Sequence, residues 1–165
     1  KDGELIMQEA NVYYQLGNME KFEALMKEAT DLQPDNADAQ YNIGVMNLQR
    51  GNNAEARKYF QKALKIAPDN ANAAMNCATT YANEGDALVD QMNALGNTAN
   101  DIKRFDELKN SKDASYRLAA EVLNEYVKNN PKNPNKSVLE YLSNIYLSLN
   151  DMTNYKRIKA ILDKN

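Results

Sequence analysis

The sequence predicts an all-α protein made of about four helical hairpins stacked side by side. The first observation is a repeat: the Pro-Asp-Asn segment at 34–36 recurs at 68–70, and the Gly-Asn pair at 17–18 recurs at 51–52. Both intervals are 34 positions. The second observation is that apolar residues recur in steps of three and four, which places them on one face of a helix. A period of this length indicates hairpins that bury their apolar faces against their neighbours.

Each repeat contains the signals for two helices and the turns between them. In the second repeat, Ala56, Phe60 and Ala63 lie at helical spacing on the second helix. Pro68 ends that helix because proline cannot continue it, and the side chain of Asn70 is suited to cap the next one. The pattern divides the chain into units at 3–36, 37–70, 71–133 with an insert at 87–114, and a degenerate unit at 136–165. We expect these units to form a single domain over residues 1–165.

The second unit resembles a tetratricopeptide repeat over its whole length. Its matching positions are Ile43, Gly44, Ala56, Phe60, Ala63 and Pro68, where that family places Leu, Gly, Ala, an aromatic residue, Ala and Pro. The first unit matches at Ala10, Tyr13, Gly17, Ala29 and Pro34, with Phe22 in place of the small residue. The third unit matches at Ala78, Tyr81 and Gly85, and again after the insert at Ala119, Leu123, Tyr126 and Pro131. The resemblance implies a solenoid of helical hairpins and a role in protein interaction.

The insert at 87–114 is predicted to be helical, because apolar residues keep helical spacing through it. Gly96 suits a helix stop in its middle, and Thr98 with Asp101 is typical of a capping pair that opens a new helix. We expect both helices of the third unit to extend into a projecting antiparallel hairpin, with kinks or breaks at Gly85 and at 110–113. The alternative is a set of separate short helices packed back on the array.

A second resemblance concerns the compartment. The stretches 89–96 and 104–109 are similar to an insert found in a group of bacterial envelope tetratricopeptide proteins, which are secreted with removal of a signal peptide. This resemblance implies a bacterial protein of the periplasm or cell envelope, and a cytoplasmic location stays open. Because the chain does not open with Met, we expect a mature product or an excised piece of a longer chain.

The composition argues against several classes of function. With 20 Lys and Arg against 23 Asp and Glu, the net charge of −3 gives no basis for a nucleic-acid partner. The chain has no His, so the commonest general base and metal ligand is missing. It also lacks a Gly-rich phosphate loop and the ligand sets of zinc and calcium sites. Cys77 is expected to be a small core residue. We therefore expect no enzyme, no catalytic residues, no metal and no cofactor.

The candidate binding residues come from the first helix of each unit, which by the resemblance lines the concave face of the solenoid. They are Met7, Gln8, Asn11, Tyr14, Tyr41, Asn42, Met75 and Asn76. Gln8, Asn42 and Asn76 share one repeat position and predict a row of amides, each with donors and acceptors for an extended peptide backbone. The methionines and tyrosines would add adaptable apolar contact. The alternative is that Asn at this position reflects only a preference of the family.

These observations favour a non-catalytic module that binds a protein or peptide on its concave face, without nucleic acid and without a transmembrane segment. The competing interpretation is a structural element of a larger envelope protein, which docks through the hairpin at 87–114. Charge is uneven along the chain: the unit at 3–36 has seven acidic and two basic residues, and the unit at 37–70 has three and five. Self-association through this contrast therefore stays open.

Overall fold

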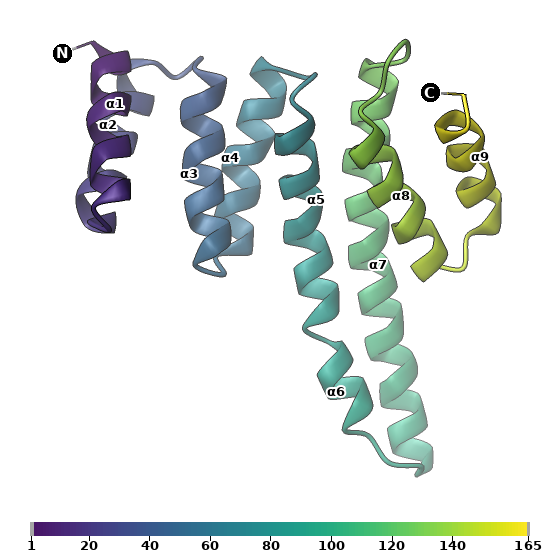
Figure 1. Cartoon of the computed structure of the whole chain (residues 1–165). Helices are drawn as coiled ribbons and strands as arrows, with labels where there is room; N and C mark the ends of the chain where they lie inside the picture. The colour runs from purple at the N-terminus through teal and green to yellow at the C-terminus, as the bar shows by residue number, and fades with distance from the viewer. Residues whose placement is uncertain (1, 165) are drawn as a thin grey trace. The chain divides into compact units, whose positions relative to one another are not determined.

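The structure is a computed structural model that describes residues 2–164 (Figure 1). Every regular element in this range is a helix. In chain order they are α1 (Gly3–Gln15), α2 (Met19–Leu32), α3 (Ala37–Gln49), α4 (Asn53–Ile66), α5 (Ala71–Asp86), α6 (Val89–Asn93), α7 (Ala99–Asn129), α8 (Lys136–Ser148) and α9 (Met152–Leu162). The predicted all-α fold class is confirmed. The chain divides into two compact units, unit 1 up to Ala73 and unit 2 from Ala74, and the prediction of a single domain stays a prediction.

Unit 1 contains two hairpins, α1 with α2 and α3 with α4, and α2 packs on α3. Each hairpin turns at a glycine in the left-handed region, with φ of 72° at Gly17 and 76° at Gly51, which glycine adopts without a steric penalty. The side-chain oxygens of Asn18 and Asn36 accept hydrogen bonds from backbone N–H groups of the helices that follow them. The helix ends therefore fall where the repeated turn residues predict them.

One apolar cluster joins the two hairpins of unit 1. Its buried members are Ala10, Phe22, Met26, Ala39, Ile43 and Met46. These side chains come from α1, α2 and α3, so α2 provides a common surface on which the other two helices are positioned. The packing of α1 and α3 on α2 fixes the distance between the helices that carry most of the candidate binding residues.

In unit 2 the insert lengthens the second helix of the hairpin more than the first. Helix α7 runs unbroken for 31 residues, and its N-terminal part extends with α6 beyond α8 and α9 (Figure 1). On the other arm α5 ends at Asp86, beside the break predicted at Gly85, and the short α6 follows. The extended hairpin is confirmed with α7 as its unbroken arm. The prediction that the first helix also extends is wrong, because α5 ends at Asp86 and the separate short helix α6 continues that arm.

The break predicted at 110–113 is wrong, because α7 is continuous there. Lys109 and Asp113 lie four residues apart and form an ion pair of 2.8 Å, a spacing that supports a helix. Leu108 is buried in the same stretch and anchors it. The ion pair within the helix and the burial of Leu108 thus outweigh the low helix propensity of Asn110 and Ser111.

The start of α7 confirms the predicted capping pair. The Thr98 hydroxyl accepts a hydrogen bond from the backbone N–H of Asp101 (3.2 Å), and the Asp101 carboxylate accepts one from the backbone N–H of Thr98 (3.1 Å). This reciprocal pair satisfies two donors at a helix start. Gly96 lies in the loop between α6 and α7, two residues beyond the Ala94 C-cap.

The core of unit 2 is formed by side chains of α5, α7, α8 and α9. Leu123, Leu139, Leu142 and Ile158 are its largest fully buried aliphatic members. Cys77 is fully buried, as predicted for a small core residue. Among the described residues, no helix is both long enough and apolar enough to cross a membrane.

Candidate functional site

A pocket of about 210 Å³ lies in unit 1 between α1 and α3, with one residue contributed by α2. It is lined by Asn11, Tyr14, Phe22, Tyr41, Asn42, Val45, Met46 and Gln49. Four of the candidate residues chosen from the sequence thus come together, namely Asn11, Tyr14, Tyr41 and Asn42. The first helix of each repeat presents the same face, so the turn of helix that carries Asn11 and Tyr14 lies beside the one that carries Tyr41 and Asn42.

Two pairs of aromatic rings involve residues that line this pocket. The ring of Tyr14 packs on the ring of Phe22, with centroids 5.1 Å apart and planes tilted by 55°. Phe22 is buried at 4% exposure, whereas Tyr14 is 46% exposed and open to a ligand. The ring of Tyr41 is held in the same way against Phe60, with centroids 5.8 Å apart. Both tyrosines are therefore braced by buried phenylalanines, which lowers the entropy they would lose on binding.

The polar part of the pocket consists of side-chain amides. Asn11 and Gln49 lie toward solvent, and Asn42 is half-buried. Each amide offers two N–H donors and an acceptor oxygen, the same groups that a peptide backbone requires. None of the lining residues carries a formal charge. The pocket therefore suits a neutral chain with alternating hydrogen-bond donors and acceptors.

The other four candidate residues lie elsewhere. Met7 packs against the apolar cluster of unit 1, and Gln8 is exposed on α1 without lining the pocket. Met75 and Asn76 are half-buried on the part of α5 that belongs to unit 2. The predicted row of Gln8, Asn42 and Asn76 stays a prediction.

Four pocket residues are not among the eight candidates, namely Phe22, Val45, Met46 and Gln49. A signal for Phe22 exists, because it stands where the second repeat has Ala56, and a large ring in a small residue's place must displace or brace a neighbour. Its partner is Tyr14. Met46 gives no such signal, since its apolar character is equally that of a core residue, and it is 4% exposed.

A second pocket, of about 270 Å³, lies in unit 2 and is more polar. It is lined by Arg117, Ala120, Glu121, Asn124, Tyr146, Leu149, Asp151 and Asn154. Its groups bond mainly to one another: Arg157 donates to the Asn124 oxygen (2.8 Å), and the Asn124 amide donates to the Tyr146 hydroxyl (2.6 Å). Hydrogen bonds from the side chain and backbone of Asn154 lower the pKa of Asp151. This network joins α7, α8 and α9 and gives Asn124, Tyr146, Asp151 and Asn154 a structural role.

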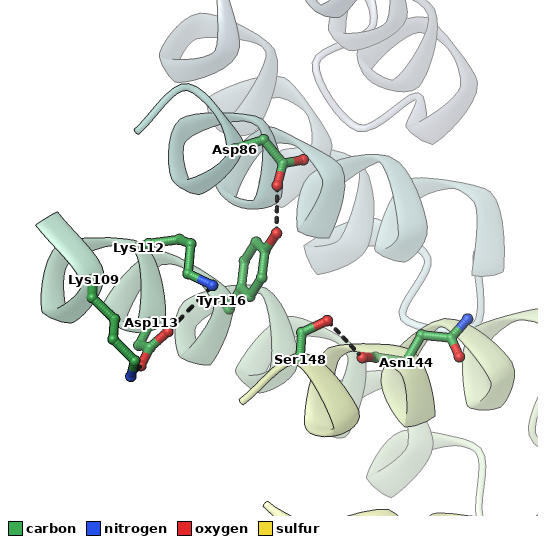
Figure 2. Close-up of polar contacts among 7 residues, drawn as sticks. All are labelled: Asp86, Lys109, Lys112, Asp113, Tyr116, Asn144 and Ser148. Carbon is green, nitrogen blue, oxygen red and sulfur yellow. Dashed lines mark hydrogen bonds and ion pairs between the residues drawn. The ribbon is translucent and has the colours of Figure 1, made fainter. Parts of the chain in front are cut away.

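A further polar group in unit 2 connects α5 to α7 (Figure 2). The Tyr116 hydroxyl donates to the Asp86 carboxylate, and burial together with this bond raises the pKa of Tyr116 to about 12. Asp113 is buried and paired with the ammonium groups of Lys109 (2.8 Å) and Lys112 (3.6 Å). Within residues 2–164 no group of three or more His, Cys, Asp or Glu side chains is arranged to hold a metal ion.

Comparison with known proteins identifies the repeat. Residues 7–71 match the model of the tetratricopeptide repeat. Among solved structures, the chain is similar to the thermophilic TPR protein TTC0263 of Thermus thermophilus, with 16% identity over 97% of this chain and 89% of that one and a TM-score of 0.46. It is also similar to MamA AMB-1, with 14% identity over 97% and 96% of the two chains and a TM-score of 0.42. A search of curated proteins gives no match. The segment that contains the pocket therefore lies within the residues that match the tetratricopeptide repeat model.

Proposed function

We propose that the chain is a non-catalytic interaction module and that the pocket between α1 and α3 binds an extended peptide segment of a partner protein. The observation that carries this proposal is the joining of three amides, Asn11, Asn42 and Gln49, with the exposed ring of Tyr14 in one uncharged pocket. Tetratricopeptide repeats are interaction surfaces built from stacked hairpins, and this pocket lies on the first helices of two consecutive hairpins.

The chemistry of the pocket favours a peptide with neutral side chains. Amides pair with both the N–H and the C=O groups of an extended backbone, and this pairing is independent of the peptide's sequence. Tyr14 offers a flat apolar face with a polar tip, a combination enriched at protein interfaces. A charged side chain placed here would lose hydration without gaining an opposite charge from any lining residue.

The proposal is tested by selecting peptides from a random phage-displayed library on the immobilised chain. A fluorescent copy of the best peptide is then titrated by anisotropy against the wild type and against Asn42→Arg, which fills the pocket with a long cationic side chain. The matched control is Gln61→Arg, a change to the same cationic side chain at an exposed position of α4. We expect binding to wild type and control, and at least about ten-fold weaker binding to Asn42→Arg. If no peptide were recovered, or if Asn42→Arg and Gln61→Arg bound the peptide equally well, the proposal that this pocket binds a peptide would be refuted.

A second candidate function is favoured by the hairpin at 87–114. On its α7 arm, Ile102 is 58% exposed and Phe105 is 40% exposed, three residues apart on one face. We propose as the alternative that this arm docks the chain into a larger assembly. In the same titration, the double variant Ile102→Asp/Phe105→Asp distinguishes the two functions. A peptide that binds the pocket should bind this variant as it binds wild type, whereas a peptide that binds the α7 arm should bind it more weakly.

A further inference from the structure

Three side-chain amides of the pocket between α1 and α3 are unpaired. Asn11, Asn42 and Gln49 line this pocket, and within residues 2–164 no hydrogen bond engages their side chains. Asn47 on α3 shows the contrast, because its amide donates to the Ile43 carbonyl (3.0 Å). Each unpaired amide therefore has two N–H donors available to a ligand.

The spacing of two of these amides matches one backbone conformation of a peptide. Asn42 and Gln49 are seven residues apart on α3, so they share one face and lie about 10 Å apart along the axis at a rise of about 1.5 Å per residue. A polyproline II helix repeats every three residues and rises about 3.1 Å per residue, so carbonyl groups three residues apart point the same way and lie about 9 Å apart. The flexible side chain of Gln49 can absorb the small difference between these two lengths.

A β-strand conformation does not fit the same two amides. Successive residues of a strand point to opposite sides, so carbonyl groups three residues apart face in opposite directions. Carbonyl groups two residues apart face the same way but are separated by only about 7 Å, and those four residues apart by about 13 Å. A strand would therefore present equivalent carbonyls to Asn42 or to Gln49, but not to both.

The wall of the pocket between the two amides is apolar. Val45 and Met46 lie between them on α3, and Met46 is 4% exposed. On the α1 side, the exposed ring of Tyr14 packs on the buried ring of Phe22. A proline ring is apolar and its nitrogen carries no hydrogen, so it can fill such a space without burying an unsatisfied donor. Aromatic side chains are the surfaces on which proline-rich segments dock.

We propose that the peptide bound in this pocket is a proline-rich segment in the polyproline II conformation. This specificity rests on the proposed peptide-binding function and deepens it, since it names the conformation and the residue that the pocket selects. The amides of Asn42 and Gln49 donate to two carbonyl groups three residues apart, and a proline ring between these carbonyls packs on the ring of Tyr14. Asn11 donates from α1.

The donors of the pocket and the acceptors of such a segment are complementary. A proline-rich backbone has many carbonyl groups and few N–H groups, and the unpaired amides supply the N–H donors that those carbonyls require. The segment also loses little conformational entropy on binding, because polyproline II is the form that a proline-rich chain already adopts when free.

Anisotropy titration of a fluorescein-labelled oligoproline peptide tests this specificity. The comparison peptide has the same length and alternates Val and Ser, so it is neutral and contains no proline. We expect wild type to bind oligoproline at least about ten-fold more tightly than the comparison peptide, a difference of about 1.4 kcal/mol.

Two pairs of variants show which groups carry the preference. Gln49→Met removes the amide and keeps the length of the side chain, so oligoproline should bind about three- to ten-fold more weakly through loss of one hydrogen bond. Gln15→Met makes the same change at an exposed position of α1 outside the pocket and should bind like wild type. Tyr14→Ala should weaken oligoproline binding, whereas Tyr14→Phe keeps the ring and should bind like wild type.

Failure of this specificity is distinguishable from failure of the proposed function. If peptides selected from the library bind the pocket without containing proline, and oligoproline does not bind at about 1 mM protein, the polyproline II specificity is overturned and the peptide site stands. It is also overturned if oligoproline binds equally to wild type, Gln49→Met and Asn42→Arg, since the peptide then binds elsewhere. If neither oligoproline nor any library peptide binds, the proposed function and the specificity fall together.

Discussion

The ring of Phe60 lies against the backbone of Gly44, so that a Cβ at Gly44 would stand 2.6 Å from the ring carbons Cδ1 and Cε1. In the first hairpin, one repeat earlier, Ala10 and Met26 take the corresponding places, and both belong to the apolar cluster of unit 1. The second hairpin thus places a glycine beside a phenylalanine ring. The first hairpin places the methyl group of an alanine beside the narrower side chain of a methionine. The contact also positions α3, the helix that carries Tyr41 and Asn42.

Gly44→Ala should destabilise unit 1 by about 1–2 kcal/mol. The added methyl group gains about 1 kcal/mol in helix propensity, but overpacking against a buried ring costs more than that. Urea denaturation followed by circular dichroism measures the difference. The control is Gly44→Ala/Phe60→Met, which reproduces the pair of the first hairpin and should recover part of the loss. A single variant as stable as wild type would show that the ring moves freely.

Thr98→Ala should fray the start of α7 and cost about 1 kcal/mol locally, because the first turn loses its side-chain acceptor. Hydrogen exchange of the Asp101 backbone amide should become faster, since this N–H donates to the Thr98 hydroxyl. Thr98→Ser keeps the hydroxyl and should exchange like wild type. Equal exchange in all three proteins would mean that packing alone holds the end of α7.

Much of the fold was predictable because its signals are local. Gly51 and Asn36 mark the bounds of α3 through their own backbone and side-chain chemistry, and the same signals recur in the neighbouring repeat. The continuity of α7 was not predictable in this way. It depends in part on the burial of Leu108, which involves the folded surroundings of the helix. The Lys109–Asp113 ion pair, four residues apart on one helix, is by contrast a local signal that the sequence contains.

The pocket was predictable to the extent that it follows the repeat. Asn11 and Asn42 were selected because they occupy the inward positions of consecutive first helices, and the packing of α1 and α3 on α2 brings them together. Phe22 comes from a second helix, and its contribution depends on how far its ring reaches under Tyr14. Side-chain volume decides that reach; the departure of Phe22 from Ala56 of the second repeat signals a larger side chain but does not show which neighbour it contacts.

Alkaline pH should destabilise unit 2 through Tyr116. Its pKa is raised by burial and by the bond to Asp86 to about 12, above the ordinary value near 10, so folding favours the protonated phenol. The stabilisation is complete below pH about 10 and is lost as the pH rises toward 12. Tyr116→Phe removes this group and should show a flatter stability profile between these values. Denaturant unfolding at several alkaline pH values measures the stability of wild type and of Tyr116→Phe. If the two stabilities fell in parallel with rising pH, the assignment of this pH dependence to Tyr116 would be contradicted.

The central claim, that the pocket between α1 and α3 binds an extended peptide, is tested most directly by following backbone amide chemical shifts during titration with a selected peptide. The account predicts the largest changes at Asn11, Tyr14, Asn42 and Val45, and their loss in Asn42→Arg. Changes confined to residues 87–114, or spread equally over both units, would contradict it.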